Sequence, residues 1–185
     1  SGDRRLVWLH QVESVEDLLS LLNSLIICFK KVFAGPPYFE CYDGKEEELI
    51  KPPFLTFASK GILFVLSIGE NGTPDPVIGF GAGIRADWSE VSEFLASNRT
   101  KLATDPEKYL YMAEIGVIND FRNRGLGTAL VKARIAVART YHGYEEVTHV
   151  IMRTAKVGSN SRSIYEKLEA TSKRLELTDI LSQLF

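Results

Sequence analysis

Two glycines and an arginine stand close together between two apolar segments in the second half of the chain. They form the pattern Arg122-x-x-Gly125-x-Gly127, and a helical hydrophobic pattern follows directly. The N–H groups in the first turn of a helix have no acceptor inside the helix, and the helix dipole attracts anions to this end. Glycine lets the backbone close around phosphate oxygens because it has no Cβ. The pattern therefore predicts a site for a phosphate or diphosphate group.

Two common phosphate-binding motifs are excluded by the spacing of these residues. The Walker loop needs a Gly-Lys-Ser/Thr sequence, which is absent after the two glycines. The dinucleotide motif needs G-x-G-x-x-G, and neither Gly125-x-Gly127 nor the glycines of segment 77–85 supply it. A different phosphate ligand is therefore expected.

A single carboxylate interrupts the apolar segment that precedes the glycines. Glu114 lies within residues 109–118, which are apolar and of strand length. A carboxylate inside an apolar strand is unfavourable unless it is paired or used in chemistry. Two interpretations stay open: a group that accepts a proton or orients a cation, and a structural partner of an arginine.

Hydrophobic periodicity predicts a mixed α/β fold around these residues. Strands are expected at residues 6–12, 62–68, 77–85, 109–118, 147–154 and 173–177. Helices are expected from Ser14 to the Gly35-Pro36-Pro37 stop, at 45–60 with an interruption at Pro52-Pro53, and at 87–99, 125–141 and 159–168. No linker divides the chain, so we expect one domain over residues 3–185 and interpret Ser1-Gly2 as a remnant of tag cleavage.

The strand predicted at residues 77–85 alternates glycines with apolar side chains. Gly79, Gly81 and Gly83 are expected on one face, and Ile78, Phe80, Ala82 and Ile84 on the other. A strand face without side chains lets another group approach the backbone closely. That group is either a tightly packed helix or a ligand, and the sequence leaves both alternatives open.

Composition excludes several classes of function. The 185 residues carry a net charge of -2 at pH 7, and the pI of about 6.0 argues against a dedicated nucleic-acid binder. The chain contains no apolar run of the ~18 residues that a membrane span requires. Its two cysteines, Cys28 and Cys41, build neither a disulfide framework nor a zinc site. We therefore expect a cytoplasmic protein without a metal ion, with no nucleic-acid partner and no membrane partner.

The segment from Glu114 to Leu130 resembles the acetyl-CoA motif of the GNAT superfamily of N-acetyltransferases, Arg/Gln-x-x-Gly-x-Gly/Ala. Further along, the segment 160–168 resembles the second motif of that family, an Asn followed by a helix that carries a Tyr. Together with the order of elements, the resemblance covers most of residues 6–177. It implies a GNAT-like fold: a central mixed, mostly antiparallel sheet, flanked by helices and splayed at the cofactor site.

The resemblance also implies acetyl-CoA (coenzyme A) as the cofactor. Amides between Arg122 and Thr128 would hold the diphosphate, and a backbone N–H within residues 115–117 would polarise the thioester carbonyl. The cofactor-binding residues that it implies are Ile115, Gly116, Val117, Arg122, Asn123, Arg124, Gly125, Leu126, Gly127, Thr128, Asn160 and Ser163.

Catalytic and acceptor residues follow from the same resemblance. Tyr165 is predicted to be the general acid for the leaving thiolate, because a phenol with a pKa near ~10 stays protonated at neutral pH. Glu114 is predicted to be the general base, or the carboxylate that orients the ammonium group of the acceptor. Tyr38, Phe39, Glu40 and Tyr42 lie in the loop that resembles the acceptor wall, and aromatic rings with carboxylates suit a cationic amine.

The predicted activity is direct transfer of acetyl from acetyl-CoA to a primary amine of a small molecule or peptide. The chain departs from the family pattern after the second motif, where Glu169-Ala170 replaces a Gly-Phe pair and 17 residues (185 minus 168) follow Leu168. The acceptor wall is then absent, rebuilt, or supplied by the second chain of a homodimer. Two alternatives remain: a catalytically silent CoA-binding regulatory module, and an acyltransferase that uses a longer acyl-CoA along the glycine face.

Overall fold

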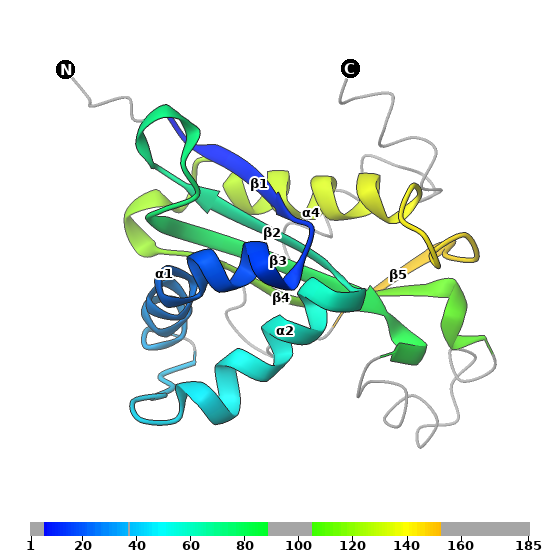
Figure 1. The fold of residues 1–185 in the computed structure, drawn as a ribbon, viewed down its shortest axis with the longest axis horizontal. Helices are drawn as coiled ribbons and strands as arrows, with labels where there is room; N and C mark the ends of the chain where they lie inside the picture. Colours follow the sequence, from blue (N-terminus) through cyan, green and yellow to red (C-terminus); the bar gives the residue numbers. More distant parts are fainter. Residues whose placement is uncertain (1–5, 37, 89–104, 153–185) are drawn as a thin grey trace.

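A five-stranded sheet forms the centre of the computed structural model, which describes residues 6–36, 38–88 and 105–152 (Figure 1). The strands follow one another across the sheet in chain order: β1 (Trp8–Val12), β2 (Ile62–Ser67), β3 (Val77–Arg85), β4 (Tyr109–Val117) and β5 (His149–Met152). The first four strands are antiparallel neighbours, and β5 runs parallel to β4. The predicted mixed α/β fold with a mostly antiparallel sheet is confirmed.

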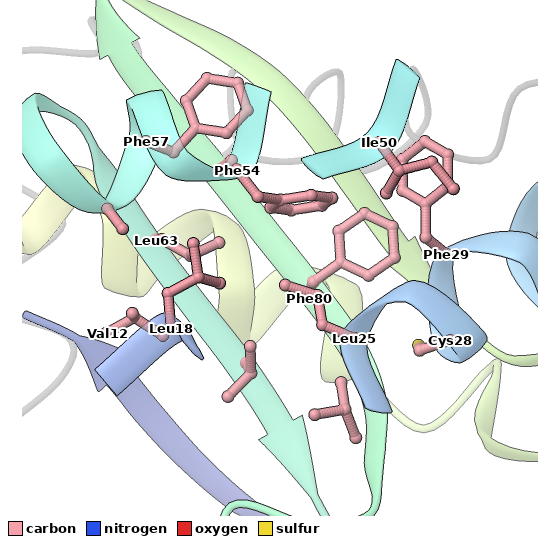
Figure 2. Packing of buried hydrophobic residues seen from close by; sticks show 14 of the residues in the cluster. Val12, Leu18, Leu25, Cys28, Phe29, Ile50, Phe54, Phe57, Leu63 and Phe80 are labelled. Atoms are coloured by element: carbon pink, nitrogen blue, oxygen red, sulfur yellow. The ribbon is translucent and has the colours of Figure 1, made fainter. Parts of the chain in front are cut away.

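Helices cover both faces of this sheet. Helices α1 (Val15–Phe33) and α2 (Lys51–Lys60) pack on one face, and α4 (Leu126–Ala138) packs on the other (Figure 1). On the α1/α2 face, Phe80 of β3 meets Phe29 and Phe54, with ring centroids 5.5 and 5.6 Å apart (Figure 2). Burial of these aromatic rings fixes both helices against the strands that carry the candidate site.

Helix α1 begins where the sequence predicts. The Ser14 side chain accepts a hydrogen bond from the N–H of Asp17 at 3.1 Å, and Glu16 and Asp17 occupy the positive end of the helix. The helix ends at Phe33, before Gly35 and Pro36.

The interruption expected at Pro52-Pro53 is wrong. A π-helical turn, Glu46–Ile50, leads directly into α2, and the two prolines lie in the first turn of that helix. N–H groups in a first turn have no intrahelical acceptor, so proline costs no hydrogen bond there. The prolines therefore lie just after the change from the π-helical turn to α2 and do not end the helix.

The face expected for Ile78 is also wrong. Leu66 of β2 pairs with Gly79, whereas the next residue, Ser67, pairs with Val77, so β3 contains one extra residue at Ile78. Such a β-bulge changes the side on which the following residues lie. Ile78 consequently packs in the α4 cluster, and Phe80 packs in the α1/α2 cluster.

Several other expectations fall partly or wholly outside the described residues. Of the segment 87–99 expected to be helical, only Asp87 and Trp88 are described, and they lie in the 3₁₀ turn Ala86–Trp88. The elements expected at 159–168 and 173–177 lie outside as well. Helix α4 ends at Ala138, three residues before the predicted Tyr141. Within the described ranges, no helix is both long enough and apolar enough to cross a membrane.

Candidate cofactor- and acceptor-binding site

A sharp turn connects β4 to the N-terminus of α4. Asn123 and Gly125 both adopt left-handed backbone conformations, with φ of 61° and 79°, which glycine tolerates best. The N–H of Ala129 donates to the carbonyl of Gly125 at 3.0 Å, the first bond of the helix. The N–H groups of residues 126–128 therefore precede the first intrahelical donor and have no acceptor within the helix.

The end of α4 is open at Gly125. This residue is exposed, and a Cβ built on it would meet no atom within 4 Å. Gly125 also has no side chain with which to cap the helix. The turn thus offers a row of amide donors, an uncapped helix dipole and space beside them. These residues fit the diphosphate of a coenzyme A molecule.

Two arginines brace this turn. Arg122 donates from Nε to the carbonyl of Val117 at 2.8 Å. Arg124 donates from Nη2 to the carbonyl of Asp120 at 3.0 Å, and its guanidinium lies 5.1 Å from the ring centre of Phe121. The sequence predicted positive charge at this place. The structure adds a second role, because Arg122 also holds the loop to the end of β4 and Arg124 holds the loop to its own 3₁₀ turn.

The orientation of the β4 amides follows from its ladder with β3. The N–H of Ile118 donates to the carbonyl of Ile78 at 3.0 Å. Alternate residues of an antiparallel strand direct their N–H groups to the same neighbour. The N–H groups of Ile115 and Val117 consequently point away from β3, and the bond from Arg122 to the Val117 carbonyl agrees with this. The N–H groups of these two residues are the candidate hydrogen-bond donors to a thioester oxygen.

Gly116 has a packing role in this strand. A Cβ built on it would lie 2.6 Å from Cγ1 of Val32 in α1 and 2.9 Å from Cζ of Phe80. No side chain fits there, so glycine allows β4 to lie directly against α1.

The pairing of β4 with β5 covers the first part of β4. Pairs extend from Tyr109 with His149 to Met112 with Met152. The residues that follow Met152 lie outside the described chain. The splay between these strands therefore stays a prediction.

Glu114 and the predicted acceptor loop lie close enough to interact electrostatically. Tyr42 packs edge-on against Phe29 of α1, with ring centroids 5.2 Å apart, and its hydroxyl donates to the carboxylate of Glu40. Burial raises the pKa of Tyr42, and the carboxylates of Glu40 and Glu114 raise it further. The structure thus brings together Glu114 from β4 and two of the four predicted acceptor residues.

The other two predicted acceptor residues are exposed. Tyr38 packs against Phe33 with ring centroids 4.8 Å apart, whereas Phe39 is 71% exposed and has a φ of 52°. Both lie on the same loop as Tyr42 and can contact a ligand that approaches it.

Lys30 of α1 holds this loop. Its Nζ forms ion pairs with the carboxylates of Asp43 and Glu46, the second at 2.7 Å. The hydrogen bonds from Lys30 lower the pKa of both carboxyl groups, and those carboxylates raise the pKa of Lys30. The loop is therefore fastened to α1 by charged side chains.

One buried residue was missed in the sequence analysis. Arg134 of α4 is 0% exposed and donates from Nε to the carbonyl of Leu130 at 3.1 Å. Its Nη1 donates to the carbonyls of Ala82 at 2.5 Å and Glu114 at 3.1 Å. The signal was present in the sequence: an arginine inside an apolar helix pattern, in a chain with an unexplained glycine face.

Arg134 also answers the open question about that face for its middle residue, Gly81, and strand residues lie beside Gly79 and Gly83. A Cβ built on Gly81 would lie 3.1 Å from Nε of Arg134 and 3.3 Å from Cβ of Leu130. Helix α4 therefore fills the space beside this glycine, as the packing alternative required. The observation that suggested a channel for a longer acyl chain no longer supports it.

Three predicted site residues, Asn160, Ser163 and Tyr165, lie outside the described residues. Their roles stay predictions from the family resemblance.

The sequence profile of the acetyltransferase (GNAT) family matches residues 21–169, which is most of the chain. The protein therefore belongs to this family of acyltransferases, whose members use an acyl-CoA as donor. A comparison with curated protein sequences finds no significant match.

Solved structures of other acetyltransferases share the fold. An aminoglycoside acetyltransferase from an uncultured soil metagenomic sample superposes with a TM-score of 0.55 at 14% identity, covering 92% of this chain and 95% of that chain. An acetyltransferase of Trypanosoma brucei gives 0.54 at 17% identity, covering 88% and 91%. A ribosomal-protein-alanine N-acetyltransferase of Brucella melitensis gives 0.50 at 14% identity, covering 88% and 90%. At such identities the likeness shows the fold.

Proposed function

We propose that this protein is an acetyl-CoA-dependent N-acetyltransferase that transfers acetyl directly to a primary amine of a small molecule or peptide. One observation carries the proposal: the uncapped end of α4, open at Gly125, follows β4 directly, and β4 carries Glu114. A diphosphate site and a carboxylate beside an aromatic loop are thus joined through one strand.

The residues of the chain divide the work of such a transfer. Acetyl-CoA would supply the activated acetyl group as a thioester. The N–H groups of residues 126–128 bind diphosphate, and Arg122 and Arg124 add positive charge. The N–H groups of Ile115 and Val117 stabilise negative charge on the thioester oxygen, and one such donor contributes about 3 kcal/mol in other enzymes.

In this proposal, Glu114 and the acceptor loop at 38–46 handle the amine. An amine attacks only as the neutral base, so its ammonium form must first lose a proton. Glu114 accepts that proton or orients the ammonium group, and Glu40 adds a second carboxylate beside the ring of Tyr42. Aromatic faces and carboxylates favour a cationic acceptor. Tyr165 protonates the leaving thiolate, as the family resemblance implies.

The proposal is tested by measuring thiol release from acetyl-CoA against a panel of amines. The neighbouring folds suggest an aminoglycoside and a peptide with an N-terminal alanine, and a simple diamine and a peptide with an internal lysine complete the panel. We expect turnover with at least one amine and a product heavier by one acetyl group in mass spectrometry.

Parallel measurements separate the alternatives. If the protein binds acetyl-CoA but releases no thiol with any amine, the silent regulatory module is favoured. If thiol is released faster from butyryl-CoA than from acetyl-CoA, a longer acyl donor is favoured. Replacement Tyr165→Phe should lower kcat by about 10²-fold while acetyl-CoA affinity is kept. Unchanged kcat would remove the acid role of Tyr165.

A further inference from the structure

We infer that Arg134, buried on the side of the sheet opposite the acceptor loop, is a positioning residue for the reaction centre. It clamps a bulge of β4 and thereby fixes the peptide group that joins Glu114 to Ile115. The catalytic consequence rests on the proposed acetyl transfer, whereas the clamp itself does not.

The bulge is visible in the pairing of β3 with β4. Ala82 pairs with Glu114, whereas Ile84, two residues later in β3, pairs with Tyr111, three residues earlier in β4. Strand β4 therefore contains one extra residue between these two pairs. A bulge bends the strand and disrupts the regular ladder beside it. A strand in this condition needs another source of hydrogen bonds to keep one conformation.

Arg134 adds hydrogen bonds from α4 at the last regular pair beside the bulge. The two carbonyls that its Nη1 contacts belong to Ala82 and Glu114, the paired residues at the edge of the bulge. The bond from Nε to Leu130 fixes the guanidinium to its own helix. A planar guanidinium with several fixed donors can hold two strands at once, which a single ammonium group does less well.

The space for this side chain is provided by Gly81. Its Cβ position lies within 3.1 Å of Nε and 3.3 Å of Cζ of Arg134. Gly83, two residues further along the same strand, contacts Leu110 and Tyr111 instead. Only the first of these two glycines therefore touches the guanidinium, and the pair forms a natural test and control.

The position of the bond matters for chemistry. The carbonyl of Glu114 and the N–H of Ile115 belong to the same peptide group. A cationic donor on the carbonyl polarises that group and makes its N–H a stronger donor. The N–H of Ile115 points away from β3. The proposed function places the thioester oxygen on that side of β4. The same contact sets the backbone from which the Glu114 side chain projects. Arg134 therefore acts on both candidate groups without touching the substrate.

Amide hydrogen exchange of the unliganded protein tests the clamp without reference to activity. The N–H groups of Glu114 and Gly116 point toward β3, so their exchange reports whether the ladder beside the bulge opens. In Arg134→Met we expect these two amides to exchange about tenfold faster or more, while amides of β2 keep their wild-type rates. Uniform acceleration throughout the sheet, or no change, would overturn the proposal.

Kinetics test the positioning role. We expect Arg134→Met to lower kcat by about tenfold, less than the loss of a direct oxyanion donor, with an unchanged dissociation constant for coenzyme A. Arg134→Lys should recover part of this loss, because it keeps the cation. Gly81→Ala, which displaces the guanidinium without removing it, should lower kcat severalfold. Gly83→Ala should stay within about twofold of wild type.

The outcomes remain distinct. If the wild-type protein releases no thiol from any amine, the proposed function fails, and exchange at Glu114 and Gly116 still decides about the clamp. If the amides of Glu114 and Gly116 exchange faster in Arg134→Met but kcat does not fall, Arg134 has only a structural role and the positioning role is overturned. If Arg134→Met does not fold, Gly81→Ala and Gly83→Ala decide: equal kcat and equal exchange in these two variants would overturn the proposal.

Discussion

The two loops at the candidate site are held in different ways. The turn from Asn119 to Gly125 is fixed by its own backbone, through left-handed residues, a helix start and arginine bonds to nearby carbonyls. The acceptor loop at 38–46 is held by ion pairs between Lys30 and two carboxylates. Backbone geometry of the first kind demands particular residues at particular spacings, whereas surface ion pairs do not. A backbone turn of the first kind can therefore be predicted from the sequence, whereas the ion pairs that hold the second loop cannot.

Among the variants that test this difference between the two loops, Gly125→Glu should have the largest effect, a loss of affinity for coenzyme A. The side chain enters a left-handed position and brings negative charge to the proposed anion site. We expect the affinity for coenzyme A, measured by calorimetry, to fall more than about 100-fold, equivalent to ~2.7 kcal/mol. The control is Gly44→Glu in the acceptor loop, because Gly44 has a φ of 74° and equally open space. Equal loss of affinity in both variants would remove the assignment of the α4 end.

Glu114→Gln should give the next largest effect. Replacement of a general base typically lowers the rate by ~10²–10⁴, and we expect kcat to fall by about 10²-fold. The acidic limb of the pH–rate profile should shift or disappear, because the titrating carboxylate is gone. Glu107→Gln, a half-buried carboxylate just before β4, serves as the control. An identical pH–rate profile in Glu114→Gln and wild type would restrict Glu114 to a structural role.

Lys30→Met should have a moderate effect, confined to binding of the acceptor amine. The loop loses both ion pairs, so an amine must order it on binding. We expect KM for the amine to rise roughly two- to tenfold, with unchanged affinity for coenzyme A. Lys31→Met is the control, since Lys31 is the next residue of α1 and is exposed. A weaker binding of coenzyme A in Lys30→Met would mean that the two loops are not independent.

The smallest effect concerns pH. Lys30 lowers the pKa of Asp43 and Glu46 below their ordinary values of 3.8 and 4.5. The stabilisation from these pairs is thus complete above the ordinary values and is lost as pH falls through the lowered ones. The difference in Tm between wild type and Lys30→Met should therefore persist from pH 7 to about pH 5 and vanish in more acidic solution. A difference that is constant down to pH 2.5 would contradict this account.

Local signals sufficed to predict much of the fold. The cap at Ser14, the hairpin of β2 and β3, and the glycine pattern before α4 each depend on neighbouring residues, so a single sequence reveals them. The prolines at the start of α2 were misread because proline both ends and begins helices. The bulges at Ile78 and before Glu114 were not foreseen, because pairing register depends on strands distant in sequence.

Long-range contacts limited the prediction of the site in the same way. The turn proposed to bind the anion is a contiguous segment, so its residues could be chosen from the sequence alone, and their binding role stays a prediction. Two contacts join elements that are distant in sequence, so no local pattern predicts them. They are the ion pairs of Lys30 with residues 43 and 46, and the hydrogen bond from Arg134 to the carbonyl of Glu114. Burial of a charged residue such as Arg134 also runs against its hydropathy, so hydropathy alone places it on the surface.

The close approach of Gly116 to Val32 and Phe80 limits how the enzyme can diversify. Since not even a methyl group fits at this point, the strand that carries the candidate site residues packs directly against the first helix. We expect descendants that acquire new acceptors to change the surface loop and to leave this seam untouched. Laboratory evolution for altered amine preference should accordingly concentrate its accepted substitutions between residues 38 and 46.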